Sequence, residues 1–156
     1  MIDEKFRKVV AYNENGIEGI RRTGVKILEM RDRYVKLMMP LKGNVNHVNI
    51  MYAGSLFSLG EMTGGVIFFA AFDYMNYHIV AKEVNIRFRR PAVTDVTVTA
   101  EISEEAVRNI AEEMTEKGKA DIILDLELKD AKPEVVALVH GVWQGTRNPE
   151  GFIVPW

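Results

Sequence analysis

Hydrophobic positions recur along the chain with two different periods, and the local period predicts a helix or a strand at each place. Helical spacing occurs in three segments, residues 1–15, 53–72 and 103–118. The second segment is apolar nearly all round, and the first carries one apolar stripe made of Ile2, Phe6, Val9 and Val10. Ser103 and Gly118 are expected to cap the third, whose apolar stripe consists of Val107, Ile110, Ala111 and Met114.

Alternation with a period of two predicts the strands. Two runs within residues 25–39 are broken at Arg31-Asp32-Arg33, which indicates a hairpin that Pro40 closes. The later runs cover residues 84–89, 95–102, 120–129 and 134–146. In the first of these, Val84, Ile86 and Phe88 are expected on the buried face. This order of elements predicts an α+β fold in which an antiparallel sheet is wrapped around the long central helix.

Composition places these elements in one domain and excludes several classes of binding partner and site. The chain has 156 residues, of which 47% are hydrophobic, so we expect a single core over residues 1–156. A net charge of −2 gives no electrostatic basis for binding nucleic acid or a membrane surface. The absence of cysteine excludes disulfides, thiolate metal sites and a cysteine nucleophile, and fits a reducing cytoplasm.

No targeting or metal-binding signal is present in the sequence. The first residues, MIDEKFRKVVAY, are charged where a secretory signal is apolar. The longest apolar run, Met62–Phe72, is shorter than the roughly 18 to 20 residues of a membrane span. His78 and His140 lie in predicted strands without nearby ligands, so no metal is expected. We therefore expect a cytoplasmic protein with no membrane partner.

Glu61 is the only charged residue between Tyr52 and Phe72. A helix that is apolar all round must be covered on every side, so this carboxylate is expected in or beside a medium of low dielectric constant. A structural explanation is an ion pair with an arginine such as Arg87 or Arg89. A functional explanation is an acid held ready for chemistry.

The residues one and two helical turns from Glu61 are unusually small. They include Gly54, Ser58, Gly64 and Gly65, set between the aromatic residues Phe57 and Phe68. Each glycine inside a helix costs about 1 kcal/mol relative to alanine. Something must therefore approach this face closely, and a ligand and the backbone of a second copy are both possible.

The start of the same helix offers hydrogen-bond donors. Backbone N–H groups near Ala53 to Leu56 have no partner within a helix, and the helix dipole is positive there. Such donors can stabilise a developing oxyanion. Glu61 lies about 10 Å further along the axis, at 1.5 Å per residue, so the spacing permits a shared site without requiring one.

These residues resemble a known family. The pattern Asn46-x7-Gly54-SLFSLG-Glu61, followed by VNIRFRRPAVTDVTVTAEI at 84–102, is similar to hotdog-fold acyl-CoA thioesterases of the phenylacetic-acid-degradation type and to their uncharacterised thioesterase relatives. The similarity runs from about Gly16 to Thr146 and implies the hotdog fold. The family has His-Gly-Gly at the helix start and usually an aspartate in place of Glu61, whereas this chain has Tyr52-Ala53-Gly54.

The resemblance implies a role for each matching position. Glu61 would be the general base or nucleophile, Gly54 would donate its N–H to the thioester carbonyl, and Asn46 would orient the carbonyl or the water. Tyr52 stands in place of the family histidine and, with Ala53, would lie against the substrate. Ser58 would hold the acid or bond back to its own helix.

The resemblance also implies the partners. Proteins of this kind are dimers or tetramers with the acyl-pantetheine channel between subunits, and they need no cofactor beyond the coenzyme A of the substrate. Arg89 and Arg90, beside a proline turn, are the best candidates for the coenzyme A phosphates. The other candidate cations are Lys42, Lys82 and Arg87.

Two alternatives remain open at this point. His47 precedes Glu61 by fourteen residues, a spacing similar to that of hotdog hydroxyacyl dehydratases, in which a histidine abstracts a proton and the acid assists. A non-catalytic module that binds an acyl-CoA or lipid is the other alternative, and Tyr52 in place of the histidine is the observation in its favour. An acyl-CoA thioesterase remains the principal hypothesis.

Overall fold

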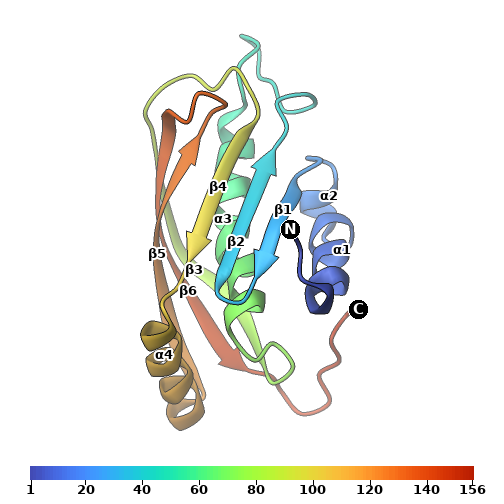
Figure 1. Ribbon diagram of the computed structural model, residues 1–156, viewed down its shortest axis with the longest axis vertical. Helices are drawn as coiled ribbons and strands as arrows, with labels where there is room; N and C mark the ends of the chain where they lie inside the picture. Colours follow the sequence, from blue (N-terminus) through green and yellow to red (C-terminus); the bar gives the residue numbers. More distant parts are fainter.

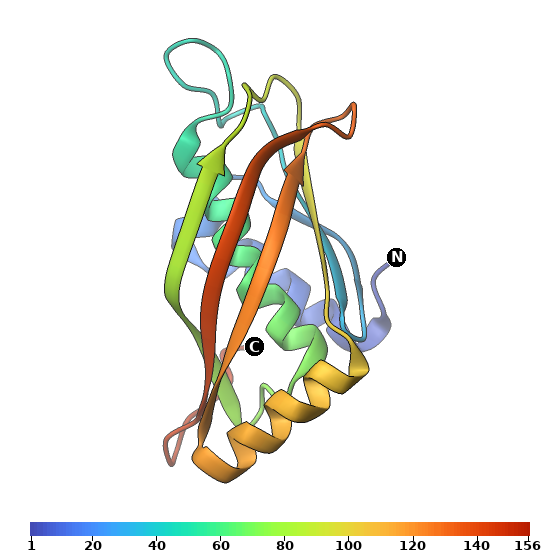
Figure 2. The same ribbon diagram turned by 90° about the vertical axis from the view of Figure 1, so that its left-hand side faces the viewer.

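An antiparallel sheet curls around one long helix in the computed structural model, which describes residues 1–156 (Figure 1). The helix is α3 (Ala53–Ala71), and the view turned by 90° shows it running diagonally inside the curl of the sheet (Figure 2). The expected α+β plan is therefore confirmed. Local periodicity was sufficient to predict it because the strands and helices differ so clearly in their apolar spacing.

The strands form one sheet in the order β1-β2-β4-β5-β6-β3, with every neighbouring pair antiparallel. Their bounds are β1 (Lys26–Arg31), β2 (Tyr34–Met39), β3 (Tyr77–Phe88), β4 (Val96–Glu101), β5 (Lys119–Lys129) and β6 (Val135–Arg147). The hairpin between β1 and β2 turns at Asp32 and Arg33, where Arg33 has a φ of 62°. β4 and β5 share only two residue pairs, so the sheet opens between them.

The helices agree with the sequence except near the start of the chain. Helix α4 (Glu104–Lys117) is capped by the Ser103 hydroxyl, which accepts from the Ala106 N–H at 3.1 Å, and ends at Gly118 with a φ of 77°. The first expected helix is divided into a 3-10 turn, η1 (Glu4–Phe6), and α1 (Arg7–Asn15). A further short helix, not predicted, is α2 (Glu18–Arg21).

The two edges of the sheet differ. The outer edge of β1 is covered, because Met30 accepts from the Asp3 N–H at 2.9 Å and donates its own N–H to the Met1 carbonyl at 3.2 Å. The outer edge of β3 has no neighbour, although the strand is 12 residues long. Long free edges are sites where a second chain can add a strand.

One expectation about β3 is wrong. The alternation placed Phe88 on the buried face, but its side chain is 50% exposed. Val84 and Ile86 do reach the core and are partly buried. Phe88 is the last residue of an edge strand, where the strand has passed the core and no neighbour covers it on the outer side.

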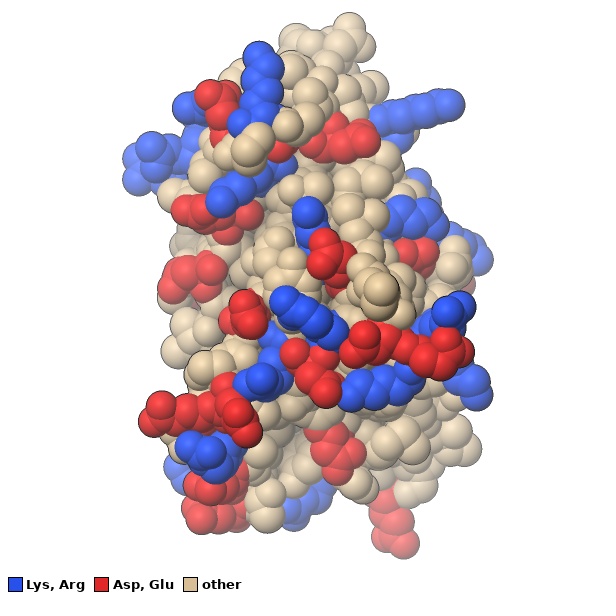
Figure 3. Space-filling model, in the orientation of Figure 1, with Lys and Arg blue, Asp and Glu red and all other residues tan.

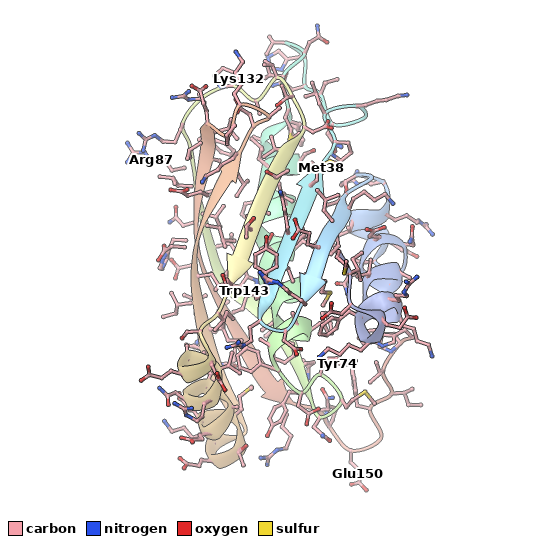
Figure 4. The ribbon with its side chains drawn as sticks, viewed as in Figure 1. Met38, Tyr74, Arg87, Lys132, Trp143 and Glu150 are labelled. Atoms are coloured by element: carbon pink, nitrogen blue, oxygen red, sulfur yellow. The ribbon has the colours of Figure 1, made fainter.

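Helix α3 lies against the sheet through two glycines. A methyl group at Gly64 would lie 2.0 Å from the Trp143 ring, and one at Gly60 would lie 2.7 Å from Val139. The Trp143 indole points from β6 into the space under the helix and is 1% exposed (Figure 4). Its N–H has no hydrogen-bond partner, so close packing alone holds the ring in place.

By length and composition alone, α3 could cross a membrane. Most of its residues are nevertheless buried against the sheet of the same chain. The helix therefore has the surroundings of a core helix, as its sequence indicated.

We expect Gly64→Ala to lower the free energy of unfolding by about 1–3 kcal/mol, because the rigid Trp143 ring must move to admit the methyl group. Gly19→Ala, in the short helix that spans Glu18–Arg21, is the control. Its methyl group meets no atom within 4 Å, so the gain in helix propensity should stabilise the chain by up to about 1 kcal/mol. Urea unfolding of both variants tests the contrast, and equal stability of the two would contradict it.

Candidate active site

One row of residues on α3 is less covered by the rest of the chain than its neighbours, with Ala53 and Phe57 exposed and the other members partly exposed. We call it the open stripe; its members recur every four positions and are Ala53, Phe57, Glu61, Gly65 and Phe69. The row follows the i, i+4 ridge, which is inclined to the helix axis. The expectation that α3 is covered on every side is therefore wrong for this chain alone, because the curled sheet encloses only part of the helix circumference.

Glu61 lies in the middle of the open stripe and is half-buried. Desolvation raises the pKa of its carboxyl group above the ordinary value, and no cation lies within ion-pair distance of it. The structural explanation, a pair with Arg87 or Arg89, is therefore wrong. The carboxylate is expensive to ionise and unpaired, as expected for an acid kept for chemistry rather than for stability.

The positions around Glu61 that are glycine are small for different reasons. Gly60 and Gly64 admit side chains of the sheet, as described above, and Gly54 lies under the ring of Tyr52, whose Cε1 would be 2.5 Å from an added methyl group. Only Gly65 has open space before it, with no atom of the chain within 4 Å of a methyl group added there. The need for close approach by a ligand or a second copy is thus confined to Gly65.

Two donors are free at the start of α3. The N–H groups of Ser55 and Leu56 both donate to the Tyr52 carbonyl, at 2.9 and 3.2 Å. No acceptor is present for the N–H groups of Ala53 and Gly54. The predicted donor at Gly54 is therefore available, while the broader expectation of free donors as far as Leu56 is wrong because the first turn tightens onto Tyr52.

A hollow of about 410 Å³ beside the helix start contains several predicted residues. Tyr52, Gly54 and Ser58 line it, together with Arg22, which the sequence did not indicate. Tyr52 is 57% exposed. The Ser58 hydroxyl donates to the Gly54 carbonyl at 2.8 Å, so of its two expected roles the bond within its own helix is the one observed.

Asn44 fixes the position of this helix start and was also missed. It is buried, its side chain donates to the carbonyls of Thr23 and Pro40 at 2.7 and 2.9 Å, and it accepts from the Ser55 hydroxyl at 2.9 Å. The Asn44 carbonyl also accepts from the Tyr52 N–H at 2.7 Å. An asparagine in a Gly/Asn-rich loop has no distinguishing local pattern, so only its tertiary contacts reveal this role.

A second hollow, of about 310 Å³, lies on the other side of the helix start. Asn46, Ala53, Arg89 and Arg90 line it together, although they are far apart in the sequence. Asn46 is occupied in its own loop, where its side-chain oxygen accepts from the N–H groups of Val48 and Ile50. Arg90 pairs with Glu134 at 2.7 Å, whereas Arg89 has no ion-pair partner. We call this space the Arg89 hollow.

Glu61 lines neither hollow. It lies seven residues beyond Gly54 on the same face of α3, which corresponds to about 10 Å along the helix axis. A single thioester carbonyl is therefore too small to contact both the Gly54 N–H and the Glu61 carboxylate of one chain.

The remaining candidate cations and His47 line neither of these two hollows. Lys82 pairs with Asp121 at 2.8 Å and holds the pKa of that carboxyl below its usual range, and Arg87 lies in a separate hollow on the exposed face of the sheet. Lys42 and His47 are exposed on the loop before α3 and have no side-chain hydrogen bond. No group of three or more His, Cys, Asp or Glu side chains is placed to hold a metal ion.

Acidic and basic side chains are interspersed over the face shown in Figure 3. This mixture agrees with the net charge of −2. No concentrated basic field is therefore present on this face.

Comparison with known proteins identifies the family. The model of the family described as "Putative thioesterase (yiiD_Cterm)" matches residues 9–144. A structure from Pseudomonas aeruginosa, described as a protein of unknown function and "Probable Thioesterase", is 38% identical over 90% of this chain and 95% of that one, with a TM-score of 0.85. No protein of curated function matches the chain.

More distant structures share the fold. A "putative thioesterase" from Shewanella oneidensis is 17% identical with a TM-score of 0.78, and covers 92% of this chain and 99% of its own. A thioesterase from Haemophilus influenzae is 11% identical with a TM-score of 0.70, and covers 89% and 90% respectively.

The fold and the family match therefore define a hotdog-fold thioesterase, a thioester hydrolase. Within that class, the chain belongs to the thioesterase family whose model covers residues 9–144. The resemblance drawn from the motif around Gly54 and Glu61 is confirmed at the level of this family. The resemblance to the phenylacetic-acid-degradation type in particular stays a prediction.

The hydrogen bonds of the Asn44 side chain provide a test of what positions the start of α3. Ser55→Ala removes the donor to the buried Asn44 oxygen and should cost about 1–3 kcal/mol of unfolding free energy. Ser58→Ala is the control, since its hydroxyl only bonds back within α3, and we expect a change within about 0.5 kcal/mol. Denaturant unfolding measures both, and a loss for Ser58→Ala as large as that for Ser55→Ala would refute the assignment.

The raised pKa of Glu61 makes stability depend on pH in a defined direction. Because the folded state favours the protonated acid, ionisation destabilises the fold progressively as pH rises from the ordinary glutamate pKa through the raised one. Glu61→Gln mimics the protonated form, so its melting temperature should exceed that of the wild type at pH 7–8. The difference should vanish near pH 4. Melting curves from pH 4 to 8 measure it, and a difference independent of pH would count against desolvation as the cause.

Proposed function

We propose that the protein hydrolyses acyl-CoA thioesters, with Glu61 activating the attacking water. The observation that carries the proposal is a half-buried carboxylate with no ion-pair partner within the chain, in the middle of the open stripe of an apolar helix. Family membership supports the reaction class, and the raised pKa of Glu61 brings this acid closer to the pH at which a general base both accepts and returns a proton.

The chemistry needs only water and the thioester. The Glu61 carboxylate takes a proton from a water molecule as its oxygen attacks the carbonyl carbon, and the carbonyl electrons move onto oxygen. Free N–H groups at a helix start stabilise that oxyanion. When the carbonyl re-forms, the C–S bond breaks, the thiolate leaves and the protonated Glu61 returns the proton to sulfur. The products are a carboxylic acid and free coenzyme A thiol.

A second copy of the chain supplies what one copy lacks. The separation of about 10 Å between Gly54 and Glu61 keeps the donor and the acid of one chain apart. Two features are available for pairing, the free edge of β3 and the open stripe of α3. A homo-oligomer packed on this side would place the helix start of one subunit against Glu61 of the other and enclose the substrate between them.

The Arg89 hollow is the proposed site for the phosphates of coenzyme A. Arg89 has no ion-pair partner, Arg90 lies beside it, and Ala53 links the hollow to the free N–H groups of α3. An unpaired guanidinium beside a helix start is suited to a phosphate group. The thioester would then extend from this hollow onto the open stripe.

Binding without turnover is the second candidate. The Tyr52 ring lies directly over Gly54, on one side of the donors that an oxyanion needs, and no histidine occupies that place. A site that holds an acyl-CoA without hydrolysing it would have this arrangement. Release of free thiol by the wild type separates the two candidates.

We expect Glu61→Gln to lower kcat for acyl-CoA hydrolysis at least 100-fold, because the amide accepts no proton from water. Release of free thiol from a panel of short, long and aromatic acyl-CoAs measures the loss. The variant should retain acyl-CoA binding and the oligomeric mass of the wild type, a multiple of 17.7 kDa in sedimentation equilibrium. Glu105→Gln, an exposed glutamate on α4, is the control and should be fully active.

Two outcomes would count against the proposal. Full activity of Glu61→Gln would remove the acid from the mechanism. Saturable binding of acyl-CoA by the wild type, with no thiol released from any substrate, would establish the binding module instead.

A further inference from the structure

The far end of the open stripe is closed by an aromatic group that the reaction itself does not require. It consists of Tyr12 from α1, Phe69 from α3, Tyr74 from the loop after α3, and Trp156. The Trp156 ring is central, with centroids 5.2 Å from Tyr12, 5.3 Å from Phe69 and 5.5 Å from Tyr74. We call this group the aromatic wall.

Trp156 reaches the helix because the segment before it is tied down. Asn148 donates its N–H to the Asn76 carbonyl at 2.8 Å and contacts His78 Nδ1 at 2.9 Å. Phe152 stacks on the His78 ring further along. Figure 1 shows residues 148–156 leaving the end of β6 and passing below α3 toward α1, and Figure 4 shows Tyr74 beside that path.

The open stripe has free space at Gly65, between Glu61 and the aromatic wall. Gly65 lies one turn beyond Glu61 and one turn before Phe69, and nothing lies within 4 Å of a methyl group placed on it. The eight residues from Glu61 to Phe69 span about 12 Å of helix axis. An extended acyl chain advances about 1.25 Å per carbon, a projection of the C–C bond, so about ten carbons fit this length.

We propose that the aromatic wall, through Trp156, sets the longest acyl chain the enzyme accepts. The inference rests on the proposed function, in which the thioester carbonyl lies at Glu61 and coenzyme A lies toward the helix start. The acyl chain then has only one direction left along the open stripe, past Gly65 to Phe69. The rings, which pack on one another around Trp156, close the path there.

The test compares kcat/KM for straight-chain acyl-CoAs from C4 to C16 in four proteins. We expect wild-type values to fall steeply beyond about C10 to C12. Trp156→Ala should raise the ratio of kcat/KM for the C16 substrate to kcat/KM for the C8 substrate at least tenfold, because it opens the wall. Gly65→Leu should act in the opposite sense and lower the C8-to-C4 ratio at least tenfold by filling the path. Phe152→Ala, in the same segment but stacked on His78, should leave both ratios unchanged.

The outcomes distinguish failure of the aromatic-wall proposal from failure of the proposed thioesterase function on which it rests. A Trp156→Ala variant that folds, by its melting curve, but loses activity equally with all chain lengths would overturn the wall. If the wild type hydrolyses no acyl-CoA, the proposed function fails. The same comparison of chain lengths by calorimetric binding then tests the wall, and equal chain-length dependence in wild type and Trp156→Ala would overturn it.

Discussion

The contact between α3 and β6 determines most of what this molecule presents to solvent. Gly60 and Gly64 let the helix approach Val139 and Trp143 so closely that a methyl group at either glycine would overlap the sheet. That contact fixes the rotation of α3 about its axis. Glu61 and Gly65 each follow one of these glycines and lie about a quarter turn round the helix, on a side that the same sheet covers less completely, and the open stripe with Glu61 is the consequence.

The open stripe concentrates the chemistry in a helix that is otherwise core. Its one acid is desolvated by burial and has no ion-pair partner within the chain, so its ionisation destabilises the fold. The donors at the helix start are held by a separate buried network around Asn44 and Ser55. Acid and donors are thus each rigidly placed, yet about 10 Å apart in one chain. This separation is the physical argument for a site completed by a second copy.

Local signals predicted most of the elements and singled out Glu61 as an unusual acid. Ser103 and Gly118 cap α4 as their types predict, and Glu61 was evident from hydropathy alone because a charge in an apolar helix needs a reason. The glycines were harder to interpret. A glycine in a helix shows that another group packs closely against it, but not which group. Here the neighbouring groups are side chains of the sheet at Gly60 and Gly64 and the Tyr52 ring at Gly54, rather than a ligand.

The sequence by itself determined the α+β plan, the bounds of most elements, the family and the unusual carboxylate, whereas β3 begins at Tyr77, seven residues before the predicted start. These depend on periodicity, caps and composition, which are properties of neighbouring residues. Only the tertiary structure decided that Glu61 has no arginine partner, that Asn46 and Arg89 share a hollow, and that Trp156 reaches Phe69. Those facts depend on how α3 is rotated and which distant segments pack against it, and long-range packing leaves no periodic trace in the chain.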